Sequence, residues 1–116
     1  MDKLFLINFC ERVNGDGLFS NTTCKKDNII YTLTGPIKDI PDKYTIEIGL
    51  NRHITDLYGI YMNHSFTPSV YIKENNVVAL IDIYPGDEIC FNYNDSETTM
   101  ACPFETPDGM VSGKNI

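Results

Sequence analysis

The sequence predicts a mainly β domain with very little helix, and three of its features support this prediction. Short apolar segments recur along the chain, and turn-forming residues such as Gly and Pro separate them. Residues 44–50 and 89–93 alternate their side chains between two faces, which is typical of half-buried strands. Residues 55–62 are the single helix candidate, and this segment is long enough for only one or two helical turns. We therefore expect one domain built from short strands.

Two strands are expected in the first half of the chain. Residues 28–33 are rich in isoleucine and stop before Gly35 and Pro36, which predicts a strand followed by a turn. Residues 44–50 place three apolar side chains on one face of a half-buried strand: Tyr44, Ile46 and Ile48.

A hairpin is expected next. Residues 70–73 and 77–83 flank Asn75-Asn76, a dipeptide suited to a tight turn. The second segment is nearly continuous in apolar residues, so we expect a central strand that is buried on both faces.

A type II turn and a further strand complete the β pattern. Pro85 and Gly86 stand at the two inner positions of a turn over residues 84–87. After this turn one face of the expected strand carries Ile89, Phe91 and Tyr93.

Composition narrows the class of protein and of partner. The chain has 116 residues, 42% of them hydrophobic and 22% charged, which fits one globular domain with a real core. The formal net charge of −7 argues against a nucleic-acid partner and suits a basic substrate segment. The N-terminal segment has Lys3 as its sole basic flank and no small-residue cleavage site, which argues against a secretory signal. No apolar run in the sequence is long enough to span a bilayer. We expect an intracellular protein, cytoplasmic or nuclear, with no export signal and no membrane partner.

The cysteines predict neither a metal site nor disulfides. They form no short-spaced pairs, and the two histidines do not complete a zinc-binding set. Free thiols are the expected state. The residues concerned are Cys10, Cys24, Cys90, Cys102, His53 and His64.

The first motif is the glycine-rich segment Asn14-Gly15-Asp16-Gly17-Leu18-Phe19. Glycines two apart let the backbone approach a ligand and expose its amide donors. Taken alone, such a segment is more often an ordinary loop. It lacks the third glycine of a dinucleotide-binding fingerprint, so a Rossmann site explains it poorly.

The second motif is Asn63-His64-Ser65, within residues 61–69. Three interpretations are open: Asn63 caps a turn, His64 is a general base, or the three residues form a buried hydrogen-bonded junction. His64 acting on Ser65 is unattractive, because adjacent side chains rarely face each other as catalysis requires.

The third motif covers residues 85–94, where a turn leads into a strand that ends in Phe91 and Tyr93. By itself this pattern usually marks core packing. The three motifs are informative in combination.

In their order and spacing the motifs resemble those of the SET-domain protein lysine methyltransferases. The resemblance rests on Gly15-x-Gly17 with Leu18-Phe19, on Asn63-His64-Ser65-x-x-Pro68, and on Gly86-Asp87-Glu88-Ile89 closing on Tyr93. Pro103-Phe104, Gly109 and Gly113-x-x-Ile116 resemble a post-SET tail. The resemblance implies the SET-domain (β-clip) fold with a knot-like C-terminal crossing. It divides the chain into a SET domain at 1–100 and a post-SET-like tail at 101–116.

The resemblance also implies roles in binding S-adenosyl-L-methionine. Four residues would present backbone groups to the methionine part: Gly15, Asp16, Gly17 and Leu18. Asn63 would bond its amino end, and His64 would meet the adenine through its backbone. Phe104 would cover the adenine or wall the lysine channel. Arg52 and His53 precede the second motif where similar proteins contact the cofactor.

Tyr93 matches the catalytic tyrosine of the family, and Tyr61 and Phe91 are expected in the substrate channel. The implied reaction moves a methyl group to a lysine side chain of a protein or peptide. Phe91 lacks a hydroxyl that could crowd the amine, so di- or trimethylation is expected.

The sequence departs from the family pattern in three places. Phe66 and Ser69 stand where the family often has Cys and Asn after the Asn-His-Ser core, so this junction must be packed differently. Thr106, Asp108 and Ser112 stand where similar proteins have zinc-binding cysteines, so no zinc is expected in the tail. The tail would instead be held by packing of Phe104, Met110, Val111 and Ile116, or order when the cofactor binds. The stretch between the first two motifs is short, so the insert that shapes the peptide groove is reduced.

Two alternatives stay open at this point. One is a non-catalytic SET-like module that binds a cofactor or peptide, and the other is a SET-fold enzyme acting on a non-protein substrate. Either a monomer or a homodimer is compatible with the sequence.

Overall fold

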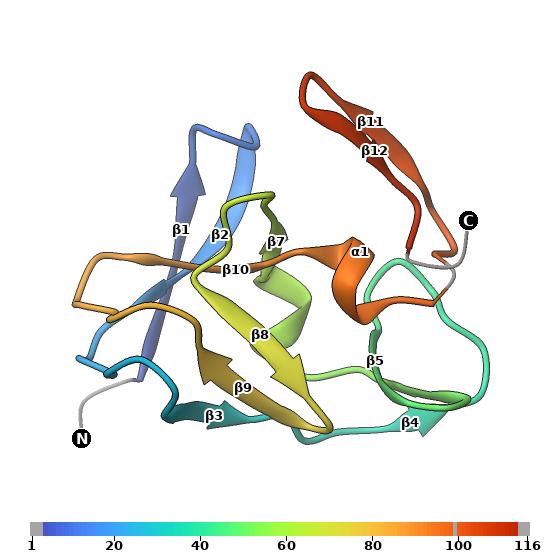
Figure 1. Ribbon diagram of the computed structural model, residues 1–116, viewed down its shortest axis with the longest axis horizontal. Helices are drawn as coiled ribbons and strands as arrows, with labels where there is room; N and C mark the ends of the chain where they lie inside the picture. Colours follow the sequence, from blue (N-terminus) through green and yellow to red (C-terminus); the bar gives the residue numbers. More distant parts are fainter. Residues whose placement is uncertain (1–3, 99, 114–116) are drawn as a thin grey trace.

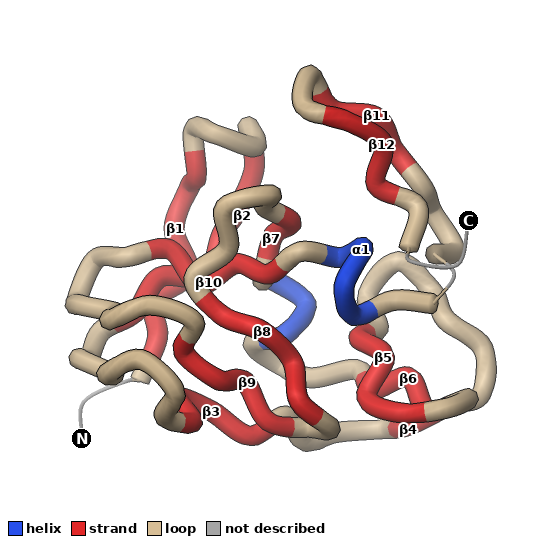
Figure 2. The backbone as a smooth tube through the Cα atoms, in the orientation of Figure 1, coloured by secondary structure: helices blue, strands red, loops and turns tan. Residues whose placement is uncertain are grey.

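The computed structural model describes residues 4–98 and 100–113, and short strands dominate this part of the chain (Figures 1 and 2). Two short helical segments accompany the strands, so the mainly β prediction is confirmed. In chain order the elements are β1 (Phe5–Cys10), β2 (Gly15–Ser20), β3 (Ile29–Thr32), β4 (Ile37–Lys38), β5 (Ile46–Gly49), β6 (Arg52–Ile54), the 3₁₀ helix η1 (Gly59–Tyr61), β7 (Asn63–His64), β8 (Val70–Lys73), β9 (Asn76–Ala79), β10 (Glu88–Phe91), α1 (Tyr93–Ser96), β11 (Phe104–Thr106) and β12 (Gly109–Val111).

The sheet that organises the site has the strand order β1-β2-β10-β7. Strand β10 pairs antiparallel with β2 and parallel with β7, so a late segment of the chain lies between two earlier ones. Cys90 is opposite Asn63, and Ile89 is opposite Leu18. The three motifs of the sequence therefore lie on neighbouring strands.

Two three-stranded sheets and a hairpin complete the architecture. Their strand orders are β3-β9-β8 and β4-β6-β5, and the tail forms the hairpin β11-β12. Figure 1 shows this hairpin standing apart from the sheets, beyond α1. In the described part of the chain, no helix has the length and apolar character needed to cross a membrane.

The hydrophobic core takes side chains from each three-stranded sheet and from the central one. The rings of Phe5, Tyr31 and Tyr58 pack edge-on with centroids 5.3–5.7 Å apart. Fully or almost fully buried members from different sheets include Leu18, Ile46, Val77 and Ile89.

Asp56 is a buried carboxylate that fixes the segment before β7. One of its oxygens accepts hydrogen bonds from the backbone N–H groups of Tyr58 and Gly59, at 2.8 and 2.7 Å. The other oxygen accepts from the Tyr31 hydroxyl and the Thr34 backbone N–H. These four donors satisfy a carboxylate that is 1% exposed, and they hold η1 directly ahead of the Asn-His motif.

Several local expectations need correction. Gly15 and Gly17 lie in strand β2 rather than in a loop, because β1 pairs with this segment along its whole length. The hairpin turn consists of residues 74–75, one position earlier than expected, and Glu74 adopts a positive φ there. Tyr44 is exposed, since β5 begins two residues later.

The expected strand through Tyr93 ends earlier. β10 stops at Phe91, and the side chain of Asn92 accepts the backbone N–H of Asn94, which starts α1. The helix candidate at 55–62 is η1, a single turn. The type II turn is confirmed: Gly86 has φ +94, and the N–H of Asp87 donates to the Tyr84 carbonyl at 3.0 Å.

Candidate active site

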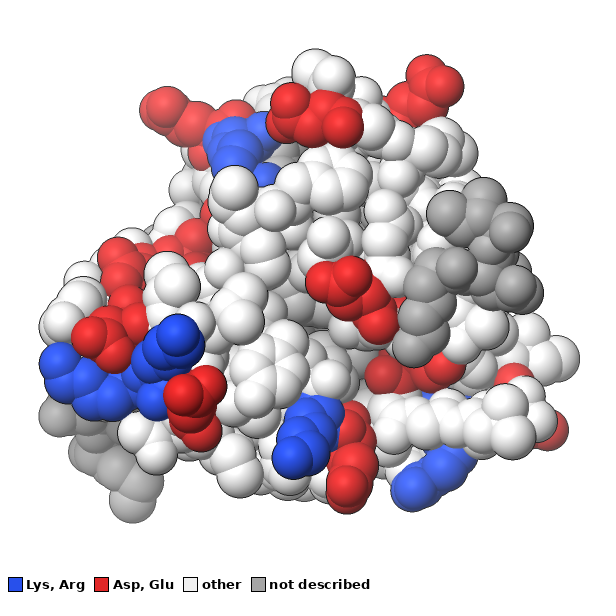
Figure 3. All heavy atoms as spheres, in the orientation of Figure 1, with Lys and Arg blue, Asp and Glu red and all other residues white. Residues whose placement is uncertain are grey.

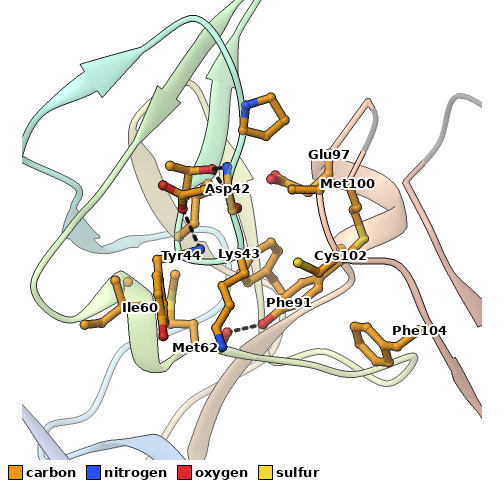
Figure 4. A pocket seen from close by; sticks show the side chains of 16 residues that line it. Asp42, Lys43, Tyr44, Ile60, Met62, Phe91, Glu97, Met100, Cys102 and Phe104 are labelled. Atoms are coloured by element: carbon orange, nitrogen blue, oxygen red, sulfur yellow. Dashed lines mark hydrogen bonds between the residues drawn. The ribbon is translucent and has the colours of Figure 1, made fainter.

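Tyr93 lines a cavity of about 230 Å³ between residues 41–46, η1 and the C-terminal tail (Figure 4). Most of the apolar lining comes from Ile46, Ile60, Met62, Phe91, Met100 and Phe104. The polar lining includes Asp42, Lys43, Thr45 and Glu97. The cavity is therefore an aromatic and aliphatic pocket with carboxylates in its wall.

Tyr93 is held at both ends. Its hydroxyl donates to the Met62 carbonyl at 2.6 Å, and its backbone N–H donates to Nδ1 of His64 at 3.1 Å. Burial raises the pKa of the Tyr93 phenol well above its ordinary value, and the negative charge of Glu97 adds to the effect. The hydroxyl therefore keeps its proton at physiological pH.

Aromatic rings surround Tyr93. The Phe91 ring lies 4.7 Å from it between centroids, His64 lies at 5.3 Å and Phe104 at 6.3 Å. Phe104 comes from β11, so the tail contributes a wall to the pocket. Such rings present electron-rich faces that attract cations.

Asn63 directs its side chain away from this pocket. Successive side chains of an extended segment point to opposite faces, so Met62 lines the pocket and Asn63 faces β2. The Asn63 amide donates to the Asp16 carbonyl at 3.0 Å. A Cβ atom at Gly17 would lie 3.1 Å from the Asn63 amide nitrogen, so this position suits glycine. The first two motifs thus meet behind the wall that carries Met62.

The glycine segment has one open edge. β10 pairs with β2 at Leu18 and Phe19 and stops there, so the edge of Gly15–Gly17 next to Asn63 is not covered by β10. The carbonyl of Asp16 already points to this edge, where it accepts the Asn63 amide. Leu18, in contrast, is fully buried and lies between Ile7 and Ile89, so its backbone is not open to a ligand.

His64 is a buried, neutral imidazole. Burial lowers its pKa, and the nearby positive charge of Arg12 lowers it further. Because Nδ1 accepts the Tyr93 N–H, we assign the proton to Nε2, which is buried without a hydrogen-bond partner in the described structure. The Phe66 ring lies 4.4 Å away, perpendicular to the imidazole.

Arg12 is a site residue that sequence reasoning missed. Its guanidinium makes a bidentate ion pair with Glu88, in which Nε donates to Oε1 at 3.1 Å and Nη2 donates to Oε2 at 2.8 Å. Its Nη1 donates to the His64 carbonyl at 2.9 Å. It therefore ties the β1–β2 connection to β10 and to β7. It also occupies the carbonyl that was expected to meet adenine. No sequence signal links Arg12 to residues 52 and 76 positions away.

Asn94 is the second missed residue, and it holds the tail. Its Oδ1 accepts the backbone N–H groups of Ser112 and Gly113 at 3.1 and 3.0 Å, and its amide donates to the Met110 carbonyl at 3.0 Å. Val111 is fully buried. The tail is therefore anchored both by the packing of Val111 and by the three hydrogen bonds of Asn94.

Other predicted contributors lie elsewhere. Tyr61 is not among the residues that line the Tyr93 pocket, and its ring packs against the hydrophobic core. Arg52 and His53 belong to β6, which pairs with β4 and β5 rather than with the central sheet. Ile116 lies outside the described residues. In residues 4–98 and 100–113, no group of three or more His, Cys, Asp or Glu side chains could hold a metal ion.

The three motifs are adjacent but do not share this one cavity. Gly17 and Asn63 do not line the pocket of Tyr93. Asn63 links the two regions: its amide donates to the carbonyl of Asp16, and its chain neighbour His64 accepts the backbone N–H of Tyr93. The site therefore has two faces, with the glycine strand and Asn63 on one and the aromatic pocket on the other.

The comparison with known proteins decides the family. Residues 15–94, more than half of the chain, match the SET domain family. The chain belongs to the SET domain family. The match confirms the resemblance that the motifs predicted, and Tyr93 lies inside the matched segment. Members of this family are methyltransferases.

Among solved structures, this SET domain is similar to a candidate histone methyltransferase of Plasmodium falciparum. The two are 29% identical, and the match covers 80% of this chain and 95% of that one, with a TM-score of 0.60. No curated protein matches the chain.

The surface is mixed in charge on the face shown in Figure 3. Acidic and basic side chains are interspersed there with wide neutral areas, and this face carries no continuous basic surface. The distribution agrees with the net charge of −7.

Proposed function

We propose that the chain is a protein-lysine N-methyltransferase that uses S-adenosyl-L-methionine. One observation carries the proposal: the Tyr93 hydroxyl lies in an aromatic pocket and is bonded to Met62, whose neighbour Asn63 contacts the glycine strand. Transfer requires the amine nitrogen to come within about 3–3.5 Å of the donor methyl carbon, so a donor on the glycine side and an amine in the pocket would have to meet beside Met62.

The glycine face fits the donor. Gly17 lets β2 pack closely against Cys10 and Asn63, and Asp16 directs its carbonyl to the open edge of β2. In this proposal Gly15, Asp16, Gly17 and Asn63 hold the methionine part, and His64 lies next to the adenine. S-adenosyl-L-methionine would supply a methyl group on a sulfonium centre.

The His64 carbonyl, which is proposed to meet the adenine, already accepts a hydrogen bond from Arg12. Arg12 donates to it at 2.9 Å, so an adenine amino group could use the carbonyl's second lone pair or displace the guanidinium. Displacement would leave Arg12 with its bidentate partner Glu88, which keeps the strand connection intact.

The pocket would prepare the lysine amine. A lysine with an ordinary pKa of about 10.4 must lose its proton to attack, at a cost of about 4 kcal/mol near neutral pH. Desolvation by Phe91, Met62 and the other apolar walls lowers that cost, because it disfavours the ammonium form. The carboxylates of Asp42 and Glu97 would attract the incoming cation before it is desolvated.

Tyr93 would act by position rather than as a base. Its pKa is raised, so its hydroxyl is protonated and bonded to the Met62 carbonyl, and its oxygen lone pairs can still orient the amine. Water at the pocket mouth would take the amine's proton. Phe91 carries no hydroxyl against the amine, so we also propose that di- or trimethylated products form.

Label transfer tests the proposal. Purified protein is incubated with S-adenosyl-L-methionine labelled in its methyl group and with lysine peptides or lysate, and incorporated label is counted. We expect Tyr93→Phe to lower transfer about 100-fold, as loss of one positioning group in a preorganised site does. Tyr71→Phe is the matched control, because Tyr71 lies on β8 outside the pocket.

Two outcomes would contradict the proposal. Equal transfer by wild type and Tyr93→Phe would remove Tyr93 from the mechanism. Binding of S-adenosyl-L-methionine in calorimetry without any transfer to protein would favour a non-catalytic module or a non-protein substrate.

A further inference from the structure

Lys43 lies at the pocket that the proposed reaction uses. It belongs to the connection between β4 and β5, and it lines the same cavity as Met62, Phe91 and Tyr93. Figure 4 shows its side chain running along the cavity, with the amino end toward Met62 in this view. Lys43, an exposed residue, thus lines the pocket that is proposed to receive a substrate lysine.

A tight turn fixes the backbone of Lys43 at the rim. The side chain of Asp42 accepts the backbone N–H of Tyr44 at 2.8 Å, and the Asp42 N–H donates to the Thr45 hydroxyl at 3.0 Å. The Thr45 N–H closes the turn on the Asp42 carbonyl at 3.3 Å. These bonds span Lys43 on both sides, so its side chain starts from an ordered position.

The surroundings of Lys43 distinguish it from Lys25 and Lys38. Lys25 and Lys38 make ion pairs with Asp82 and Asp42 on the surface. Lys43 has no ion pair with a described residue, and its amino group lies 5.1 Å from the centroid of the Tyr44 ring, which lines the same cavity. No salt bridge has to be broken for it to enter the pocket.

We propose that Lys43 is itself a methyl acceptor and is modified within its own molecule; this rests on the methyltransferase activity proposed above. The neutral Nζ attacks the methyl carbon of S-adenosyl-L-methionine, a C–N bond forms and the C–S bond breaks. The electron pair of that bond stays on sulfur, which gives S-adenosylhomocysteine. The amine has lost one proton to water before the attack, so charge and atoms balance.

Intramolecular attack is favoured by tethering. An amine fixed at the pocket rim acts at a high effective concentration, so it needs no peptide-binding groove. The methylated lysine keeps its positive charge, and its added methyl groups pack against the aromatic rings of the pocket.

Mass mapping tests the site of modification. Wild-type protein alone is incubated with methyl-labelled S-adenosyl-L-methionine, and peptides are sequenced by tandem mass spectrometry. We expect label on Lys43, and a loss of self-labelling of at least about ten-fold in Lys43→Arg, since the tethered acceptor is gone. Lys73→Arg should label as the wild type does, because Lys73 ends β8 outside the pocket.

The order of the reaction tests the intramolecular step. The fraction of molecules labelled per minute should be independent of protein concentration. A rate that rises in proportion to concentration would overturn it, because one molecule would then be modifying another.

The outcomes separate this inference from the proposed function. Tyr93-dependent label on added lysine peptides with none on Lys43 would overturn the inference and leave the proposed function intact. Absence of label on every acceptor would overturn both.

A cofactor-free measurement tests the position of Lys43 directly. n-Butylamine, which mimics a lysine side chain, is titrated into protein without cofactor, and the NMR signals of the pocket aromatic rings are followed. We expect Lys43→Ala to bind this probe at least about five-fold more tightly than Lys73→Ala, because the competing side chain is removed. Equal affinity in the two variants would show that Lys43 does not occupy the pocket.

Discussion

The two faces of the site are built differently. The glycine face rests on strands β2, β10 and β7, which are joined by backbone ladders and by the Arg12–Glu88 ion pair. The outer wall of the aromatic pocket comes from the tail, which Asn94 holds through its side-chain amide. Damage to the first face should therefore unfold the domain, whereas damage to the second should release the tail alone.

Gly17→Ala should have the largest effect on stability. The new Cβ would lie 3.0 Å from the Cys10 Cβ and 3.1 Å from the Asn63 amide nitrogen, so these side chains must give by a few tenths of an ångström. We expect a loss of about 1–3 kcal/mol in the free energy of unfolding, measured with urea, as overpacking typically costs. Gly15→Ala is the matched control, since its nearest neighbour would be 3.9 Å away; an equal loss there would contradict the packing argument.

Arg12→Ala should cause the second-largest loss of stability. It removes a bidentate partner from Glu88, whose side chain is 16% exposed, while the Arg12 side chain is 43% exposed and partly screened. We expect a loss of about 1–2 kcal/mol in urea unfolding, below the value for a buried charged pair. A stability unchanged from wild type would mean that this ion pair does not hold the glycine face together.

Asn94→Ala should change global stability least among the three substitutions and local order most. It removes three hydrogen bonds to the tail, at about 1 kcal/mol each before solvent replaces them. Amide hydrogen exchange should accelerate in residues 104–113 and stay unchanged in β2 and β10. Glu105→Gln, at an exposed tail position, is the control. Faster exchange in β10 would show that the two faces are one cooperative unit.

The smallest effect concerns pH. Burial lowers the pKa of His64 below its ordinary 6.5, so in acid the unfolded chain binds a proton on His64 more readily than the folded chain does. Stability should fall as pH drops through 6.5, by at most about 1.4 kcal/mol per pH unit. Urea unfolding at pH 7.5 and 5.5 measures this. His64→Gln should flatten the dependence. An unchanged slope would refute the assignment.

The sequence predicted those strands whose own residues form a run or an alternation of apolar side chains. The apolar runs at 70–73 and 77–83 both contain strands, but the second strand ends at Ala79, and Leu80 and Ile81 beyond it are exposed. β1 and β2 were not predicted, because Leu6, Ile7 and Phe9 are exposed on an edge strand and break the alternation. The α1 helix at Tyr93 was missed because the Asn92 cap that starts it is a single side chain.

For the site, motifs identified the residues but not their contacts. The ordered set of Gly17, Asn63 and Tyr93 was enough to predict the family. Arg12 and Asn94 could not be predicted, because each acts on residues distant in the sequence through geometry that only the folded chain provides. The two-domain division at residue 100, the bound donor and the oligomeric state stay predictions.

The position of β10 between β2 and β7 also constrains how the protein folds. Both neighbours are complete by residue 64, yet the strand that joins them begins at Glu88. A chain emerging from the ribosome therefore holds the glycine segment and the Asn-His turn without a connection between them. Closing such distant pairings is slow, so the site should appear in one late step and not grow piece by piece.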